Sequence, residues 1–480
     1  MNLAMLLEMA ADGLGTRVGI GARDDGLTFA RLRELASSVP GRLGSDSVTV
    51  ALVDRNGPIV PIALFGAAWA GASYAPLNYR LPESALGRLV EQVQPATVVD
   101  ATTGAGWLDS GDDSAAAFPD EPDRPAILLF TSGTSAAPKA AVLQHEHLLS
   151  YIFNTVEFAS AGDDEAALLA VPPFHVAGVA AVLSATYAGR RIVPLPSFTA
   201  EGWLSAARRE LVTHAFVVPT MLARIVAVME AEPDARVPTL RHLAYGGARM
   251  PLPVLERALA LFPDAGFVNA YGLTETSSTV SVLGPDDHRL AAVSEDPGVR
   301  ARLESAGRAV PGIEVRIVDV DGDPVGAGES GQILVRGAQV AGSYVGEASQ
   351  RDGDGWLHTG DVGRVDDEGY LFVGGRADDV IIRGGENISP AEIEDVLLRH
   401  PAVTAAAAVG LPDQEWGERV AAMVTLRPGT DVPVGDIAIW AREQLGSLKA
   451  PEVVAVRPEL PQTATGKVLR RQVRDDLAAE

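Results

Sequence analysis

An apolar run, Ala126–Phe130, leads into a segment that is rich in hydroxyl side chains and ends at a lysine. Hydroxyl and backbone N–H groups can surround phosphate oxygens, and a lysine ammonium adds a point charge. A Walker A loop needs Gly directly before its lysine and Ser or Thr after it, whereas this chain has Pro138 and Ala140 at those positions. The segment is therefore either a phosphate loop of another kind or a Ser/Thr-rich surface turn. Its candidate residues are Thr131, Ser132, Gly133, Thr134 and Lys139.

Two carboxylates stand in short segments that contain glycine. Glu275 ends the segment Asn269–Glu275, which follows the apolar run Ala265–Val268. A carboxylate there could hold Mg²⁺, which prefers one or two carboxylates plus substrate phosphates. Asp361 ends His358-Thr-Gly-Asp361, and a buried Asp at a strand end can accept both hydroxyls of a ribose. The alternatives are a helix start with Glu275 in its first turn, and a turn aspartate.

A basic segment near the C-terminus contains Thr463-Ala-Thr-Gly-Lys467, followed by Arg470, Arg471 and Arg474. A lysine on a glycine-bearing loop could reach into a site formed by distant parts of the chain. The alternative is a solvated basic tail.

The composition limits the function classes. The 480 residues are 47% hydrophobic and 21% charged, which is ordinary for a globular protein with a core of normal size. A net charge of −24 argues against nucleic acid or an anionic membrane as the main partner. The absence of cysteine excludes disulfides, cysteine-ligated zinc, iron–sulfur clusters and a cysteine nucleophile. The first residues lack a basic n-region, so we expect no secretory signal and a cytoplasmic protein.

The elements that must position these residues alternate between strand and helix. This alternation predicts an α/β fold with largely parallel sheets. From about Gly312 to Val373, short alternating runs separated by glycine turns predict an antiparallel β subregion, and a shorter α/β tail follows Arg376. The uncharged stretch Asn56–Tyr79 favours a buried helix ended by Pro76 over a membrane span. The expected strands are Val48–Val53, Ala126–Phe130, Ala167–Val171 and Ala215–Val218, and the expected helices include Ala200–Val212 and Leu252–Leu261.

Taken together and in this order, the segments resemble the adenylate-forming superfamily of acyl-CoA synthetases, peptide-synthetase adenylation domains and luciferases. The resemblance covers almost the whole chain. It implies a large N-terminal domain, residues 1–377, of mixed and parallel sheets flanked by helices plus a β subregion, and a small mobile α+β C-terminal domain, residues 378–480. Further matching segments are Tyr74–Asn78, Pro173–His175 with Gly178, Val218–Thr220, Tyr245–Ala248, Glu329–Gly337, Gly375–Ile381, Gly384–Glu394, Trp416–Glu418 and Lys449–Pro451.

The resemblance implies two half-reactions in one site. A carboxylate attacks the α-phosphate of Mg·ATP to give acyl-AMP and pyrophosphate, and a thiol then displaces AMP. Glu275 would bind Mg²⁺, Thr274 the α-phosphate and Asp361 the ribose with help from Arg376, while Lys467 would bridge the reacting oxygens. The phosphate loop would hold the β- and γ-phosphates. The residues on the adenine side would be Gly246, Gly247, Ala248, Tyr271 and Gly272.

The resemblance also implies a rotation of the small domain about Asp378 once pyrophosphate has left. That rotation would remove Lys467 and bring a strand carrying Gly384 and Gly385 to the site, where a thiol arm passes close to the backbone. The chain departs from the family in its phosphate loop, where Ala136 and Ala140 replace the usual glycines, and at Asn387, where some relatives have an arginine.

Residues in the matching segments limit which class of carboxylic acid the protein would use as its substrate. Val171–Gly189 contains no Asp or Glu to pair the ammonium of an amino acid, and Ala270 replaces the arginine of malonate-type relatives. We therefore expect an apolar monocarboxylic acid: fatty, alicyclic or aryl. His175 is either a gate between the acyl and thiol channels or a packed core histidine. The expected acyl-pocket residues are His175, Val176, Gly178, Pro219 and Thr220.

Coenzyme A is the first-ranked thiol acceptor, the phosphopantetheine of an acyl carrier protein is the second, and a luciferase-like oxygenase is a distant third. A non-catalytic acyl or nucleotide binder is the alternative from another class. It is weakened because Lys467, Glu275 and Asp361 occur together, which binding alone would not require. Both a monomer and a homodimer remain open.

Overall fold

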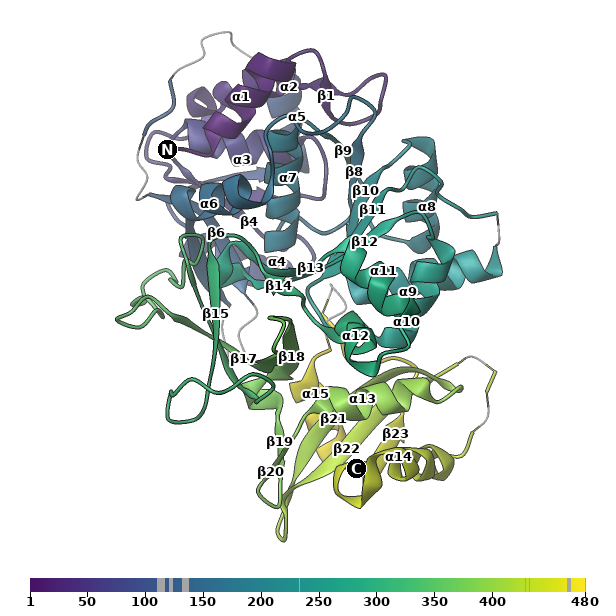
Figure 1. Cartoon of the computed structure of the whole chain (residues 1–480). Coiled ribbons are helices and arrows are strands. Elements are labelled where there is room, and N and C mark those ends of the chain that lie inside the picture. The colour runs from purple at the N-terminus through teal and green to yellow at the C-terminus, as the bar shows by residue number, and fades with distance from the viewer. Residues whose placement is uncertain are drawn as a thin grey trace.

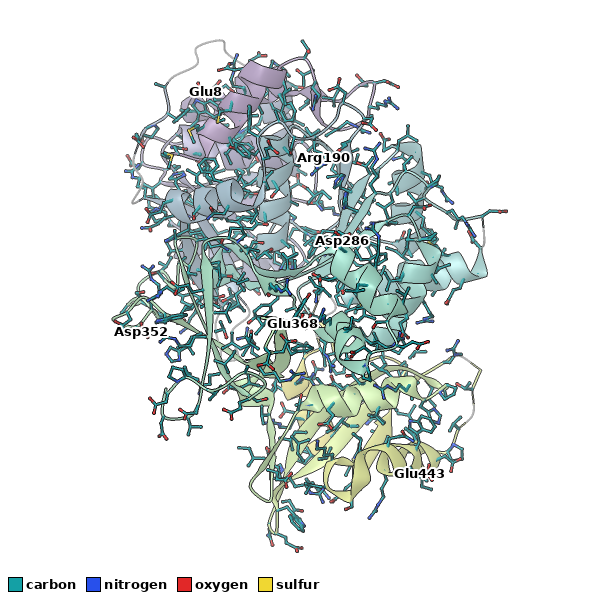
Figure 2. All side chains as sticks on the ribbon, in the orientation of Figure 1. Glu8, Arg190, Asp286, Asp352, Glu368 and Glu443 are labelled. Carbon is teal, nitrogen blue, oxygen red and sulfur yellow. The ribbon has the colours of Figure 1, made fainter. Side chains whose placement is uncertain are left out.

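The computed structural model describes the chain except residues 110–116, 121–123, 132–137, 233, 428, 431, 464–467 and 480, and except the side chain of Asn387. A large N-terminal part of helices and sheets stands above a small C-terminal part, with a β-rich region beside their junction (Figure 1). The predicted α/β fold class is confirmed. The labelled carboxylates Glu8, Asp286, Asp352, Glu368 and Glu443 are spread from one end of the molecule to the other (Figure 2).

One sheet of nine strands carries most of the N-terminal part, in the order β14-β13-β12-β11-β10-β8-β9-β1-β2. Its middle strands β8, β10, β11 and β12 are neighbours and run parallel. Parallel strands that are buried on both faces have nearly continuous apolar sequences, and the strands predicted from the sequence were apolar runs of this kind. The strands are β1 (Val18–Ile20), β2 (Leu27–Thr28), β8 (Ala166–Leu169), β9 (Arg191–Pro194), β10 (His214–Val217), β11 (His242–Gly246), β12 (Gly266–Leu273), β13 (Ser278–Leu283) and β14 (Arg308–Ala309).

Helices cover this sheet on both sides. One apolar core lies between the sheet and helices that include α8, α9 and α10. A second core joins the sheet to the neighbouring five-stranded sheet through α1, α2, α3, α6 and α7. The helices of the N-terminal part are α1 (Ala4–Leu14), α2 (Phe29–Ser37), α3 (Ile59–Trp69), α4 (Glu83–Gln92), α5 (Ala101–Asp109), α6 (His145–Thr155), α7 (Val176–Ala188), α8 (Ala200–Arg209), α9 (Pro219–Ala231), α10 (Leu252–Leu261), α11 (Pro285–Val293) and α12 (Pro297–Ala301).

The five-stranded sheet has the order β5-β3-β4-β6-β7. The buried apolar helix α3 connects the paired parallel strands β3 and β4. The sequence had predicted that Pro76 ends this helix, and the structure shows that it does not. The helix stops at Trp69 because Gly71 adopts a φ of +65° and the Ala72 N–H bonds back to the Ala67 carbonyl at 2.8 Å, a glycine C-terminal cap. The strands are β3 (Thr49–Val53), β4 (Ser73–Pro76), β5 (Ala96–Asp100), β6 (Pro125–Thr131) and β7 (Lys139–Gln144).

The region predicted to be antiparallel forms a separate four-stranded sheet, with all its strand pairs antiparallel. Beyond it, the small C-terminal part packs helices on a further sheet. These elements are β15 (Ile313–Val318), β16 (Gly331–Gly337), β17 (Leu357–Val365), β18 (Leu371–Arg376), β19 (Ile381–Arg383), β20 (Glu386–Ile388), α13 (Pro390–Arg399), β21 (Val403–Asp413), β22 (Gly417–Leu426), α14 (Val434–Lys449), β23 (Val453–Val456) and α15 (Arg470–Ala478).

Buried histidines give the fold a predictable response to acid. Burial lowers the pKa of six histidines, and the four largest shifts bring it to about 4 in His145, His147 and His175 and to about 3 in His214. The unfolded chain, with pKa values of about 6.5, binds more protons as the pH falls below that value. We expect the free energy of unfolding to fall between pH 6.5 and pH 4, by about 1–2 kcal/mol per histidine at pH 5.

Melting temperatures recorded from pH 7.5 to 4.5 check this prediction. In His147→Asn, the melting temperature should depend less steeply on pH. Asp395 acts in the opposite sense, because burial raises its pKa to about 6 and the stability it contributes is present at low pH and lost as the pH rises through 6. The loss of stability caused by the four histidines should exceed the gain from Asp395 as the pH falls. A melting temperature that stays constant or rises from pH 6.5 to 5 would contradict the prediction.

Candidate functional site

The topology brings the predicted acyl and adenine segments to one edge of the nine-stranded sheet. Because β8, β10, β11 and β12 are adjacent and parallel, their carboxyl ends meet there. The segment with His175 and Gly178 follows β8, Pro219 and Thr220 follow β10, and Gly247 follows β11. The sequence could not supply this spatial order, because β8 and β10 are separated in the chain by β9.

The turn after β11 requires its two glycines. A Cβ on Gly246 would lie 2.2 Å from the Ala270 carbonyl oxygen, and Gly247 has a φ of +79°. Beneath them, the buried Tyr245 hydroxyl lies 2.9 Å from His288 Nε2. Ala248 is exposed beyond the turn. The strand end therefore presents bare backbone, which a flat ring can approach closely.

A tyrosine, an aspartate and an arginine from three strands meet beside this turn. The Tyr271 hydroxyl donates to Asp361 Oδ2 at 2.6 Å, and Arg376 Nε lies 3.1 Å from Asp361 Oδ1. Arg376 Nη1 also donates to the Thr359 carbonyl at 2.7 Å. Burial, and then the Asp361 charge, raise the pKa of Tyr271, so its hydroxyl stays protonated as a donor.

Asp361 is buried as predicted, but it lies within β17 opposite Arg376 and not at a strand end. The sequence missed this because the chain around it, Thr359-Gly360-Asp361, reads as a turn. A carboxylate has about four lone-pair sites, so one carboxylate can accept from more than one donor at the same time.

Glu275 and Thr274 lie in a three-residue 3₁₀ turn, Thr274–Thr276, at the end of β12. The predicted apolar strand before them is longer than expected and runs through Gly272, where a Cβ would lie 1.8 Å from the Ser278 carbonyl oxygen. The helix-start alternative does not hold, because the chain leaves the turn at once through Ser277 and Ser278 with positive φ values of +55° and +112°. Such strained positions in non-glycine residues are typical of functional sites.

Two residues that the sequence did not single out contact this carboxylate or Lys139. The Tyr344 hydroxyl donates to Glu275 Oε1, and Glu347 Oε1 lies 2.7 Å from Lys139 Nζ. Lys139 Nζ is also 6.0 Å from the centre of the Tyr344 ring, within the range of a cation–π contact. Burial, and then Glu275, raise the pKa of Tyr344. The one available signal was a lone tyrosine among small residues directly after the Glu329–Gly337 segment.

Thr131 ends β6 and pairs with Lys139 at the start of β7, so the two ends of the predicted phosphate loop are held together. Ser132, Gly133 and Thr134 lie outside the described residues, as does Lys467.

The start of the predicted acyl segment is aromatic. The Phe174 ring packs between Tyr79, with 5.6 Å between ring centres, and His175, with 4.6 Å. Burial, and then the charge of Arg80, lower the pKa of His175 to about 4, so the imidazole is neutral. Its Nε2 is buried and has no hydrogen-bond partner among the described residues. Val176 and Gly178 begin α7 behind it, and Pro219 and Thr220 begin α9.

Gly384 and Gly385 form the two-residue turn between β19 and β20, whereas the sequence had placed them on a strand. Their φ values of +59° and +83° are those that a type I′ hairpin turn requires. The hairpin extends from the small domain away from β17 and β18 (Figure 1). Asp378 lies in a 3₁₀ turn, Ala377–Asp379, that links β18 to β19.

Ionic and hydrogen-bonding contacts hold the small domain against the large one in this arrangement. Arg249, just beyond the Gly246–Ala248 turn, pairs with Glu304 at 2.9 Å and with Asp395 of α13. The Ser389 hydroxyl donates to the Gly374 carbonyl at 2.8 Å. Both contacts must break if the small domain rotates.

The residues present fit a magnesium ion that arrives with a nucleotide. In the part of the chain that the structure describes, no three His, Asp or Glu residues cluster as a resident metal site would require. Glu275 offers one carboxylate, and Mg²⁺ commonly takes one or two carboxylates with the remaining ligands from phosphates and water. Among the described helices, none has the length and apolarity to cross a membrane.

Known proteins similar to this chain include several ligases. It is 35% identical over 474 residues to the feruloyl-CoA synthase of Amycolatopsis sp, covering 93% of both chains. It is 34% identical over 448 residues to a fatty acid–[acyl-carrier-protein] ligase of Streptomyces coeruleorubidus, covering 86% of this chain and 83% of that one. It is 32% identical over 496 residues to the indoleacetate–CoA ligase of Aromatoleum aromaticum, covering 94% and 93%.

Among solved structures, the o-succinylbenzoate CoA synthetase of Bacillus subtilis, in complex with its acyl-adenylate intermediate, matches with a TM-score of 0.83 at 27% identity over 98% of each chain. The ATP-bound MatB of Rhodopseudomonas palustris shares the fold, with a TM-score of 0.88 at 24% identity over 100% and 99%. The AMP-binding enzyme family matches residues 9–345, and the C-terminal domain of AMP-binding enzymes matches residues 392–467. On the strength of these matches, the chain belongs to the AMP-binding enzyme family.

Proposed function

We propose that the protein is an ATP-dependent acid–thiol ligase. It joins a carboxylic acid to AMP with release of pyrophosphate and then transfers the acyl group to the thiol of coenzyme A. The observation that carries this proposal is the arrangement of three groups around the end of β12: the Gly246–Gly247 turn, the Tyr271–Asp361–Arg376 cluster, and Glu275 and Lys139, which both contact Tyr344. A binding protein for an acid alone would need none of the three.

Each group has a chemical task in adenylation. The glycine turn and Tyr271 would receive the adenine, and Asp361 would accept from the ribose hydroxyls while Arg376 holds its carboxylate in place. Glu275 would hold Mg²⁺, which supplies charge neutralisation of the phosphates when bound. Lys139, with the hydroxyls before it, would hold the β- and γ-phosphates, and Lys467 would stabilise the charge that develops between the acid and the α-phosphate.

We also propose that the large domain ends at residue 377 and that the small domain begins at residue 378, with Asp378 as the hinge between them. We propose the cytoplasm as the compartment of the protein. The 3₁₀ turn Ala377–Asp379 supports the hinge, because it is the short link between the two sheets. A rotation there would break the Arg249–Asp395 pair and reposition the β19–β20 hairpin.

For the acid we propose an aromatic monocarboxylic acid ahead of a fatty one. The apolar helix α7, the absence of Asp and Glu from Val171–Gly189, and the Tyr79–Phe174–His175 cluster support a flat apolar substrate. The feruloyl-CoA and indoleacetate–CoA ligases among the relatives support it too.

A carrier protein is the second candidate for the acceptor. The fatty acid–[acyl-carrier-protein] ligase at 34% identity favours it, and the same phosphopantetheine arm would enter the site in both cases.

A panel of acids tests the proposal through ATP-dependent pyrophosphate release, with and without coenzyme A. We expect release with aryl acids such as cinnamates and indoleacetate, and thioester formation once coenzyme A is added. Release with none of a broad panel would contradict ligase activity and favour a binder. An acyl-AMP that accumulates despite coenzyme A, and is consumed by a holo carrier protein, would favour the second candidate.

A further inference from the structure

Residues 341–347, the strap, tie the Glu275 turn to the start of β7. The Ala341 and Gly342 N–H groups donate to the Glu275 carbonyl at 2.8 Å and 3.2 Å. A few residues on, Tyr344 pairs with Ala141 of β7 as an antiparallel bridge, and the Val345 N–H donates to the Ala140 carbonyl at 2.9 Å. The strap is therefore held by its backbone at both ends, whatever its side chains do.

At the second attachment, the Tyr344 side chain points at the Glu275 carboxylate. Its hydroxyl donates to Oε1, and Oε2 has no hydrogen bond within the part of the chain that is described. A carboxylate held through one oxygen keeps a fixed orientation and leaves the other oxygen available to a cation. The hydroxyl is not needed to hold the strap, so its bond to Glu275 calls for another explanation.

The same ring lies beside the cation of the phosphate loop. Lys139 Nζ is 6.0 Å from the Tyr344 ring centre, and the carboxylate of Glu347, at the end of the strap, lies 2.7 Å from that ammonium. Tyr344 thus contacts both the proposed metal ligand and the proposed phosphate ligand. Both contacts come from one short segment, the strap.

We propose that Tyr344 is a positioning residue for Mg·ATP: its hydroxyl orients the Glu275 carboxylate toward the metal, while its ring faces the Lys139 ammonium. This inference rests on the proposed function. It adds a residue to the site that binds neither the nucleotide nor the metal directly and acts through Glu275.

The test compares ATP binding with and without Mg²⁺ in the absence of any acid, by calorimetry on the full chain. In Tyr344→Phe, which keeps the ring, we expect the gain in affinity that Mg²⁺ provides to shrink by about tenfold, the usual cost of losing a group that orients a metal ligand. Binding of ATP in EDTA and the melting temperature should stay near the parental values. A variant with the parental Mg²⁺ dependence, or one that loses affinity equally with and without Mg²⁺, overturns the proposal.

Tyr370→Phe is the matched control, because the Tyr370 hydroxyl also donates to a carboxylate, Asp287 Oδ1 at 2.6 Å, away from Glu275. It should leave the Mg²⁺ dependence unchanged. A double-mutant cycle with Glu275→Gln guards against a folding effect: if Tyr344 acts through Glu275, the two losses do not add, and full additivity overturns the proposal. If the parental protein binds no ATP at all, the proposed function fails instead.

Discussion

Lys467→Ala should abolish pyrophosphate release from ATP and the acid, and still make thioester from synthetic acyl-AMP and coenzyme A. Adenylation concentrates negative charge where the acid oxygen meets the α-phosphate, and losing one positioned donor to such charge costs roughly 10²–10³ in rate. In the second half-reaction the rotated small domain would have carried Lys467 away. Each half-reaction is measured separately, by pyrophosphate release and by thioester formation.

Lys449→Ala is the matched control, because Lys449 is a lysine of the same small domain. It forms a partly exposed ion pair with Glu392, with 2.7 Å between Lys449 Nζ and Glu392 Oε1. Such a pair contributes about 0–1 kcal/mol, so both half-reactions should survive its loss. If Lys467→Ala in a folded protein loses both half-reactions equally, or neither, the rotating-domain assignment of Lys467 is wrong.

The distribution of lysine supports the assignments of Lys139 and Lys467. Lysine occurs at only three positions in the chain, Lys139, Lys449 and Lys467, among 39 basic residues, and all the others are arginine. A guanidinium serves surface ion pairs as well as an ammonium does, but it is planar and larger, whereas the ammonium is a compact point charge. In a chain that uses arginine almost everywhere, two of the three lysines are the residues that we propose to contact phosphate oxygens.

Glycine together with polar residues after an apolar strand is a sequence pattern that can mark a close approach of the backbone. Gly246 and Gly272 show why this works: the backbone passes too close for any side chain, so the residue type itself records the geometry. Helix α10 was predicted with its observed bounds, Leu252–Leu261, because the apolar residues of a surface helix recur at helical spacing within the segment itself.

What the sequence left out depends on contacts between distant segments. The order of the nine-stranded sheet is set by packing between elements far apart in the chain, so the meeting of β8 with β10 had no local signal. Tyr344 was missed for the same reason: its role depends on Glu275, far away in sequence. The resemblance to the family predicted a strand at Gly384 and Gly385. The two glycines have a simpler local explanation, because they form a hairpin turn in which both residues need a positive φ.

Gly385 thus has two possible roles, in the hairpin turn and on the path of the thiol. A substitution at Gly385 can distinguish between them. A Cβ on Gly385 would meet nothing within 4 Å in the present arrangement, whereas one on Gly384 would lie 2.9 Å from the Trp416 ring. Gly385→Leu therefore leaves this arrangement free of clashes, at the cost of strain from a φ of +83°. Adenylation should continue near the parental rate.

Gly429→Leu is the matched control for that strain. Gly429 belongs to the same small domain, has a φ of +80° and is equally open. If the glycines serve only the hairpin, the two variants should lose similar stability and keep both half-reactions.

If Gly385 lies on the thiol path after rotation, its leucine blocks the approach of the pantetheine arm. Thioester formation from acyl-AMP should then fall by roughly a hundredfold in Gly385→Leu, since a small displacement of reacting atoms already costs that much, and remain unchanged in Gly429→Leu. Pyrophosphate release, thioester formation and melting temperature, recorded for both variants, separate these outcomes. A Gly385→Leu protein that makes acyl-CoA at the parental rate would show that the thiol enters by another route.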